Sequence, residues 1–233
     1  MAKNKVALIT GANKGIGYEI ARQLGEKGYH VLVGARQAEA GKQAVASLQK
    51  GGTSAEFVEI DVSDRASIQK AAEAVAAQFD HLDALVNNAA IMEDKVNIAT
   101  MPEELLFRTL QTNTFGPLMV TQAFLPLLKK SPGASVINMS SGLGQLNDMG
   151  DTYPAYSISK TSLNAVTRQF AAVLHNTGIT VNSVCPGWVK TDMGGPDAEM
   201  EITDGAKTSV RLATLPAGGP SGGYFHMDQR LPW

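Results

Sequence analysis

The stretch TGANKGIG, residues 10–17, decides how this sequence folds. It follows an apolar run, KVALIT (5–10), and opens a segment in which Ile16, Ile20 and Leu24 recur every four residues as one apolar stripe. This order predicts a strand, a glycine-rich turn and then an amphipathic helix. A helix amino end carries unpaired N–H groups and a positive dipole, so the turn is a candidate phosphate site.

The three glycines of the turn are the reason to expect a ligand there. Gly11, Gly15 and Gly17 remove side chains where the backbone would approach a phosphate closely. Their spacing differs from the G-x-G-x-x-G of the common dinucleotide fingerprint, and a tight turn without a ligand is the alternative. The position of the turn between a strand and a helix favours phosphate binding.

Strand patterns recur along the whole chain. The apolar, β-branched runs fall at residues 5–10, 30–35, 55–60, 82–88, 135–140, 179–184 and 223–227. The helical segments between them are 38–50, 65–79, 102–130 and the stretch after Tyr153. Strands separated by helices predict an α/β fold: a Rossmann-like, doubly wound parallel sheet of about seven strands with helices on both faces.

The same pattern predicts a single domain over residues 1–233. We expect a cofactor-binding half over about 1–130 and a catalytic and substrate half over about 131–233. Residues 191–222 are rich in glycine and proline, and we expect them to form a mobile excursion with one short helix at 203–215.

The composition is that of an ordinary globular protein. The 233 residues are 44% hydrophobic and 18% charged, with a net charge of −2 and a pI near 6.1. This balance provides no electrostatic footprint for nucleic acid or for an anionic membrane, so neither is an expected partner. The run VALIT is too short for the core of a signal peptide, and no segment approaches the ~18 apolar residues of a membrane span.

The cysteine and histidine content indicates whether disulfides or a metal site can be expected. The single cysteine, Cys185, excludes an internal disulfide and fits a cytoplasmic location. It is most simply a small buried apolar residue, and we expect no catalytic role for it. The four histidines are scattered without metal-ligand spacing, so no metal is expected.

Two cations stand where a dinucleotide would present its adenosine ribose. Arg36 follows the second predicted strand, about 20 residues beyond the glycines, and Lys14 lies within the glycine turn. An acid at that strand end binds the 2′-hydroxyl of NAD, whereas an arginine accommodates the 2′-phosphate of NADP. Two solvated surface cations are the alternative. The pair favours NADP(H) as the cofactor.

The segment YPAYSISK, residues 153–160, places a phenol and an amine one helical turn apart. Residues i and i+4 share a helix face, so Tyr156 and Lys160 point together, whereas Tyr153 has only Ser157 at that spacing. A nearby ammonium favours phenolate and lowers the pKa of a tyrosine from its ordinary value of ~10. Such a pair alone is usually a surface coincidence. Behind a dinucleotide turn, it indicates acid–base chemistry.

Taken in order, these motifs resemble the short-chain dehydrogenase/reductase family over nearly the whole chain, with the NADPH-dependent carbonyl reductases as the nearest likeness. TGANKGIG resembles the T-G-x-x-x-G-x-G loop of that family. The other matching features are Asp61 after the third strand, NNAA (87–90), MSS (139–141), Tyr156-x-x-x-Lys160 and PGWVKT (186–191). NKGIG, CPGWVKTDM and the terminal tryptophan carry the likeness to carbonyl reductases. Ala90 replaces the usual glycine, which slightly crowds the approach of the cofactor.

The resemblance implies a role for four residues. Tyr156 would protonate the carbonyl oxygen, and Lys160 would lower the pKa of Tyr156 and hold the nicotinamide ribose. Ser141 would stabilise the developing oxyanion, with Ser140 as its rival. Asn113 would link Lys160 to solvent through a water; a local kink near Gly116–Pro117 is the alternative reason for an asparagine within a long helix.

The resemblance also implies a cofactor site and a substrate site. The expected cofactor contacts are Gly11, Asn13, Lys14, Gly15, Ile16, Gly17, Arg36, Asp61, Val62, Asn88, Ala89, Tyr156, Lys160, Pro186, Gly187, Val189 and Thr191. The expected substrate contacts are Ser141, Leu143, Tyr153, Trp188 and Met193, from segments 142–152 and 188–200. These segments are mainly apolar, which favours an uncharged aldehyde or ketone. An NAD(P)⁺-dependent secondary-alcohol dehydrogenase and a non-enzymatic NADP-binding regulator are the alternatives.

The length of the chain bears on assembly. In the family, carbonyl reductases with a long insertion before the catalytic tyrosine are monomers, and here only 14 residues separate Ser141 from Tyr156. Without that insertion, the helix over 102–130 and the helix after Tyr153, with Leu163, Val166, Phe170 and Val173, would keep exposed apolar faces. We therefore expect a homodimer or homotetramer.

Overall fold

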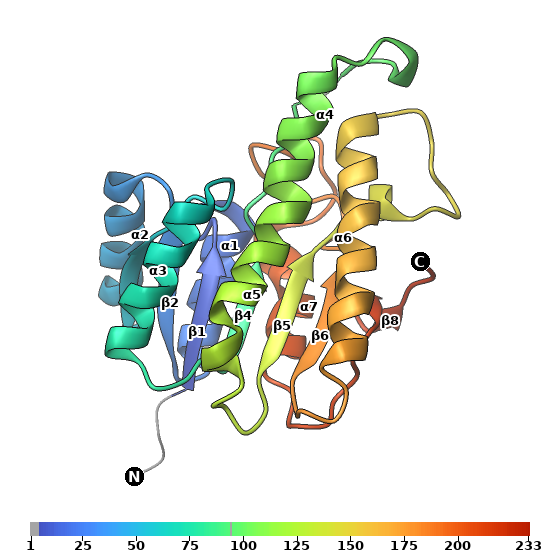
Figure 1. Cartoon of the computed structure of the whole chain (residues 1–233). Coiled ribbons are helices and arrows are strands. Elements are labelled where there is room, and N and C mark those ends of the chain that lie inside the picture. The colour runs from blue at the N-terminus through green and yellow to red at the C-terminus, as the bar shows by residue number, and fades with distance from the viewer. Residues whose placement is uncertain (1–4, 94) are drawn as a thin grey trace.

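The computed structural model describes residues 5–93 and 95–233, and its centre is one eight-stranded sheet (Figure 1). The strand order is β3-β2-β1-β4-β5-β6-β7-β8, in which β1 to β7 are parallel and β8 is antiparallel to β7. The strands are β1 (Lys5–Thr10), β2 (Tyr29–Ala35), β3 (Ala55–Glu59), β4 (Ala84–Asn87), β5 (Ser135–Met139), β6 (Thr180–Val184), β7 (Tyr224–His226) and β8 (Gln229–Arg230).

All seven predicted strands are present, with ends that differ from the prediction by no more than two residues. The central strands β4, β5 and β6 are buried along their whole length, as parallel strands covered on both faces must be. The prediction missed β8, which has two exposed residues and pairs with β7 at the edge of the sheet. A strand this short carries no apolar alternation that could reveal it.

Helices cover both faces of the sheet (Figure 1). The residues that form the two core clusters place three helices on each face. One face carries α1 (Gly15–Glu26), α2 (Ala38–Lys50) and α7 (Ile202–Ala213), and the other carries α3 (Arg65–Gln78), α5 (Gly116–Leu128) and α6 (Pro154–Val173). The doubly wound prediction is therefore confirmed. The short helix α4 (Glu103–Leu110) extends past the end of the sheet in Figure 1.

The prediction for residues 191–222 needs a correction. The expected helix exists as α7, but it is part of the helical layer and not of an excursion outside the core. Ala206, Val210 and Leu212 are almost fully buried in the first core cluster, and α7 packs against α1. The glycines and prolines that suggested an excursion lie mostly on either side of the helix.

The topology fixes where a ligand can bind. From β1 the chain moves outward to β2 and β3 and then returns to the other side of β1 with β4. Two neighbouring strands that continue in opposite directions leave a crevice at their carboxyl ends, and this switch point is where doubly wound proteins bind ligands. The turn after β1 and the residues after β4 meet there.

No helix in residues 5–93 and 95–233 combines the length and the apolar character needed to cross a membrane. Within the same residues, no cluster of three histidine, cysteine, aspartate or glutamate side chains could hold a metal ion.

Candidate active site

The glycine turn between β1 and α1 fits a phosphate. Gly11 and Gly15 have φ angles of 66° and 60°, in the left-handed region that favours glycine. The N-cap residue of α1, Lys14, makes no side-chain capping hydrogen bond, and the first turn of this fully described helix holds no acid. The helix amino end therefore keeps its N–H groups and positive dipole for an anion. Ile16 packs against the core, which orients this turn.

Asn88 ties this turn to the end of β4. Its side-chain amide donates to the carbonyl oxygens of Thr10 (3.0 Å) and Gly11 (3.2 Å). The Thr10 hydroxyl accepts N–H bonds from Asn88 (3.0 Å) and Ala89 (3.1 Å). A Cβ on Gly17 would lie 2.4 Å from the Asn88 amide nitrogen. Asn88 thus holds the turn in place, and its predicted contact with the cofactor stays a prediction.

The residues expected at the adenosine end follow β2 and β3. Arg36 is exposed one residue past β2, and Asp61 lies near it. The Asp61 carboxylate accepts the backbone N–H (2.9 Å) and the hydroxyl (2.6 Å) of Ser63. Burial raises the pKa of Asp61, but the bonds from Ser63 and the charge of Arg36 outweigh it and hold the pKa below its ordinary value. Val62 is buried against Gly116 at the start of α5.

A carboxylate that the sequence did not predict reaches the glycine turn. Lys14 Nζ lies 2.6 Å from Asp192 Oδ2, and both side chains are largely exposed. The hydrogen bond from Lys14 lowers the pKa of Asp192. We call Lys14, Arg36 and Asp192 the phosphate rim. The pairing joins residues 178 positions apart, so no local pattern could have revealed it.

The phenol–amine pair lies on one buried face of α6, as predicted. Tyr156 is 7% exposed and Lys160 2% exposed, and Lys160 Nζ lies 5.4 Å from the centroid of the Tyr156 ring. Lys160 donates to the Met139 carbonyl oxygen at 2.7 Å. Burial lowers the pKa of Lys160 from its ordinary 10.5 to about 7. This amine can therefore gain or lose a proton near neutral pH.

Ser141 begins a 3₁₀ turn, Gly142–Gly144, directly beyond β5; we call Ser141–Gly144 the catalytic turn. The Ser141 hydroxyl oxygen accepts the Leu143 N–H at 3.2 Å, which leaves its own hydrogen to donate. Ser140 is almost fully buried, and its hydroxyl lies 3.5 Å from the Lys160 carbonyl oxygen, which it can reach only weakly. The geometry favours Ser141 over its rival for contact with a carbonyl oxygen.

Asn113 lies at the centre of a π-helical turn (Gln111–Phe115) between α4 and α5. Its amide oxygen accepts the Ile91 N–H (2.9 Å), and its nitrogen donates to the Ile91 carbonyl (2.8 Å) and the Ser159 hydroxyl (3.0 Å). π-turns within α-helices occur often at functional sites. The side chain joins the segment after β4 to α6, and the predicted water relay stays a prediction.

The expected substrate segments carry exposed apolar side chains. Leu146, Met149, Trp188 and Met193 are among the exposed large hydrophobic residues, and Leu143 is half-buried. Tyr153 caps α6 with a φ of 51°, which is strained for a bulky residue.

The segment after β6 lies beside the glycine turn. Pro186 and Gly187 are half-buried, and Val189 is buried and forms a parallel bridge with Met200. A Cβ on Gly15 would lie 3.8 Å from Thr191 Cγ2. The structure thus places residues predicted for the cofactor, from both halves of the chain, on one edge of the sheet.

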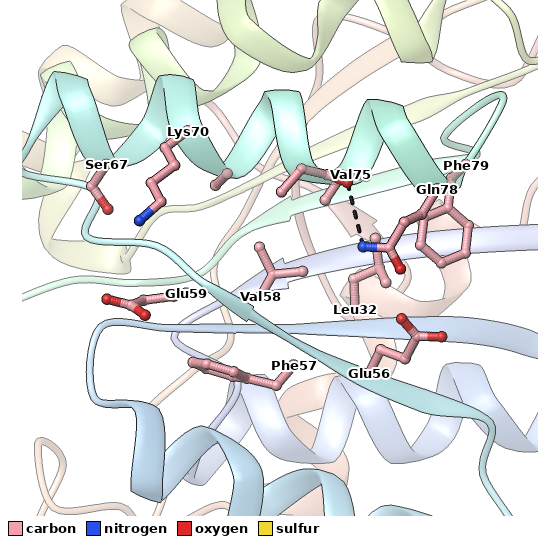
Figure 2. A pocket seen from close by; sticks show the side chains of 12 residues that line it. Leu32, Glu56, Phe57, Val58, Glu59, Ser67, Lys70, Val75, Gln78 and Phe79 are labelled. Atoms are coloured by element: carbon pink, nitrogen blue, oxygen red, sulfur yellow. Dashed lines mark hydrogen bonds between the residues drawn. The ribbon is translucent and has the colours of Figure 1, made fainter.

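A separate hollow lies between α3 and β3 (Figure 2). Its volume is about 150 Å³, and its lining includes Phe57, Val58, Lys70 and Glu59. Ligand sites usually have volumes of about 300–1,000 Å³. None of the predicted catalytic residues lines this hollow, so it is not a candidate active site.

The chain is similar to known oxidoreductases over nearly its full length. The family model for short chain dehydrogenases matches residues 5–202. (+)-Neomenthol dehydrogenase of Arabidopsis thaliana is 34% identical, with 97% of each chain covered. Carbonyl reductase [NADPH] 1 of Mus musculus is 34% identical, with 98% of each chain covered. The crystal structure of an NADPH-bound carbonyl reductase from chicken fatty liver superimposes with a TM-score of 0.89 at 28% identity and covers 99% of each chain.

The two curated relatives carry residues that this chain lacks. Their alignments extend over 288 and 274 positions, whereas this chain has 233 residues, so each relative has residues that face gaps here.

Proposed function

This chain belongs to the short-chain dehydrogenase family, and on that premise we propose that it reduces an aldehyde or ketone to an alcohol with NADPH. It is an oxidoreductase, and NADP(H) is its cofactor. When bound, NADPH supplies the hydride. The observation that carries the proposal is the buried Tyr156–Lys160 pair beside the catalytic turn, at the carboxyl edge of the sheet.

The chain's own residues would hold the cofactor along this edge. The free amino end of α1 would take the pyrophosphate, and Lys14 and Arg36 would take the 2′-phosphate. Asp61 and Val62 would contact the adenine end. Lys160 would hold the nicotinamide ribose. The other residues expected around the ribose and nicotinamide are Asn88, Ala89, Tyr156, Pro186, Gly187, Val189 and Thr191.

The chemistry requires one proton donor and one hydrogen-bond donor at the carbonyl oxygen. As the carbonyl carbon accepts hydride, the Tyr156 hydroxyl gives its proton to the oxygen, and the product is an alcohol. Ser141 donates a hydrogen bond to the same oxygen and stabilises the charge that develops there. Protonated Lys160 would lower the pKa of Tyr156. With its own pKa of about 7, Lys160 can then return a proton to Tyr156, and Asn113 takes part in the relay to solvent.

A panel of carbonyl compounds, followed by NADPH absorbance, tests this proposal. We expect turnover of uncharged, partly apolar aldehydes or ketones, because the exposed side chains of segments 142–152 and 188–200 are largely apolar. Tyr156→Phe in the same assay provides the matched control. Tight NADPH binding without turnover of any compound would favour the non-enzymatic regulator instead.

We also propose that the chain forms a homodimer or homotetramer in the cytoplasm. Phe107, Phe115 and Val173 are 60%, 47% and 75% exposed on α4, the π-turn and α6. The expected face needs a correction. Leu163 is fully buried and cannot contribute to it, and Phe170 is half-buried and packs against the second core cluster. Light scattering at micromolar concentration tests the assembly, and a monomer mass would contradict it.

A further inference from the structure

A buried tyrosine other than Tyr156 contacts the catalytic turn from β7. Tyr224, on β7, is fully buried, and its hydroxyl donates to the Ser141 carbonyl oxygen at 2.6 Å. The same carbonyl accepts the Gly144 N–H at 2.8 Å, which closes the turn. Two donors on one carbonyl oxygen use both of its lone pairs and fix the direction of that peptide group. The Ser141 backbone is therefore held from within the turn and from β7.

The Tyr224 phenol also joins the ends of neighbouring strands. It interacts with the Ser140 side chain after β5 and with the Cys185 thiol after β6. That thiol lies close to the catalytic turn, because a Cβ on Gly142 would be 3.9 Å from Cys185 Sγ. Burial, followed by the nearby Cys185 and Tyr156, raises the pKa of Tyr224 well above its ordinary value. The phenol therefore stays protonated and remains a donor at any physiological pH.

The other side of the catalytic turn rests on α6. A Cβ on Gly144 would lie 2.8 Å from Lys160 Cβ, so the turn packs directly on the catalytic lysine. The Gly144 carbonyl accepts bonds from Thr161 Oγ1 (3.1 Å) and Asn164 Nδ2 (3.2 Å). The turn is thus clamped between α6 and β7, and Tyr224 supplies the β7 side of the clamp.

An aromatic stack covers Tyr224. The Trp233 ring lies 5.6 Å from the Tyr224 ring at an interplanar angle of 17°, and the Arg168 guanidinium lies 5.6 Å from the Trp233 ring. The neighbouring Pro232 carbonyl accepts a bond from Gln145, the residue after the catalytic turn, at 3.3 Å. Residues 232–233 therefore contact both the turn and the phenol that supports it.

We propose that Tyr224 is a positioning residue for Ser141: its hydroxyl holds the catalytic turn so that the Ser141 side chain faces the carbonyl oxygen, and Trp233 holds Tyr224. This inference rests on the proposed function. Tyr224 does not contact the substrate; it acts through the Ser141 backbone, which it reaches from 83 residues away in the sequence.

The chain offers a matched control for testing Tyr224. Tyr29 is also buried, and its hydroxyl donates to a backbone carbonyl, that of Ala213, at 3.0 Å, away from the catalytic turn. Tyr224→Phe and Tyr29→Phe each remove one phenolic hydroxyl from a buried site. We expect Tyr224→Phe to lower kcat by about tenfold with KM for NADPH within twofold, because one misaligned donor weakens oxyanion stabilisation. We expect Tyr29→Phe to leave kcat within twofold.

Amide hydrogen exchange adds a readout that needs no turnover. We expect the amides of residues 142–145 to exchange faster in Tyr224→Phe and unchanged in Tyr29→Phe. If the wild type reduces no carbonyl compound, the proposed function fails while this measurement still decides the clamp. Unchanged exchange at residues 142–145 would overturn the positioning role, as would an equal loss of kcat in both phenylalanine variants.

Trp233 gives a second route if Tyr224→Phe fails to fold. Trp233→Ala removes the ring that covers Tyr224, whereas Trp233→Phe keeps an aromatic face there. We expect a several-fold loss of kcat and faster exchange at residues 142–145 in the alanine variant, with both restored by phenylalanine. Equal behaviour of the two variants in both measurements would contradict the stack's role.

Discussion

Two lysines of the proposed site occupy opposite environments. Lys160 is 2% exposed and donates to a backbone carbonyl, whereas the side chain of Lys14 is 70% exposed and pairs with a carboxylate. Burial changes the acid–base behaviour of the first, lowering its pKa to about 7, while the second stays in solvent, where it can exchange partners. In the proposed function, the buried lysine belongs to the catalytic pair, and the exposed lysine belongs to the phosphate rim that would bind the cofactor.

The largest expected effect concerns the buried pair of Tyr156 and Lys160. Tyr156→Phe removes the proton donor and keeps the ring, so kcat should fall by about 10²–10⁴-fold while NADPH binding changes little. Tyr153→Phe, three residues earlier and without the lysine partner, should alter KM for the carbonyl compound more than kcat. Steady-state kinetics on both folded variants make the comparison. If Tyr153→Phe were the inactive variant, the assignment of the acid would be wrong.

Lys160→Met should lower the activity of the enzyme but raise the stability of its fold. We expect a large loss of kcat and weaker NADPH binding, but a gain in unfolding free energy of about 1–3 kcal/mol at pH 7, because the variant no longer buries an amine. The folded pKa of Lys160 is about 7 and the ordinary value is 10.5, so the unfolded state binds more protons between these values. The wild type therefore regains stability as pH rises through this window.

Thermal denaturation at several pH values measures this difference. The gain in unfolding free energy of Lys160→Met over the wild type should be largest below pH 7 and should disappear as pH approaches 10.5. Lys14→Met, which removes an exposed lysine, is the control and should show no such pH dependence. A wild type more stable than Lys160→Met at pH 7 would show that the Met139 hydrogen bond outweighs the cost of burial.

Substitution of Arg36 tests the phosphate rim. A charge-assisted hydrogen bond contributes ~1.5–3 kcal/mol, and each ~1.4 kcal/mol is a factor of ten. The wild type should therefore prefer NADPH over NADH by roughly ten- to several-hundredfold in kcat/KM, and Arg36→Ala should remove much of that preference. Lys50→Ala, at the far end of α2, removes the same charge and should change nothing. Equal use of both cofactors by the wild type would contradict the rim assignment.

The smallest effect concerns the partner of Lys14. Asp192→Asn frees Lys14 for the 2′-phosphate. Because solvent screens an exposed ion pair, we expect NADPH affinity to rise by only about two- to fivefold. NADH affinity should not change, and the gain should shrink at high salt. Glu201→Gln breaks the neighbouring Lys190–Glu201 pair and is the control. Titration calorimetry measures the affinities for NADPH and NADH. An equal gain in affinity for NADH would show that Asp192 acts on the whole segment after β6 and not on the 2′-phosphate contact.

Much of this site followed from local patterns. The seven predicted strands, the glycine turn and the shared face of Tyr156 and Lys160 all lie where the sequence placed them, because strand and helix periodicities act over a few residues. The errors lie where such patterns are weak. β8 has only two residues, and α7 lies between glycine-rich segments that suggested a loop. Leu163 was expected on an exposed face of its helix, but the fold buries it.

The sequence by itself therefore determined the order of the elements, the expected phosphate turn and the spacing of the phenol and the amine. Tertiary structure alone decided what surrounds them. The Lys14–Asp192 pair spans 178 residues and the Tyr224–Ser141 bond spans 83, so both depend on which strand ends the sheet brings together. The pKa of Lys160 depends on the packing of β5, the catalytic turn and α6 around one amine. The spacing of Tyr156 and Lys160 placed the two side chains on one face, but the desolvation of the amine depends on what the fold packs around it.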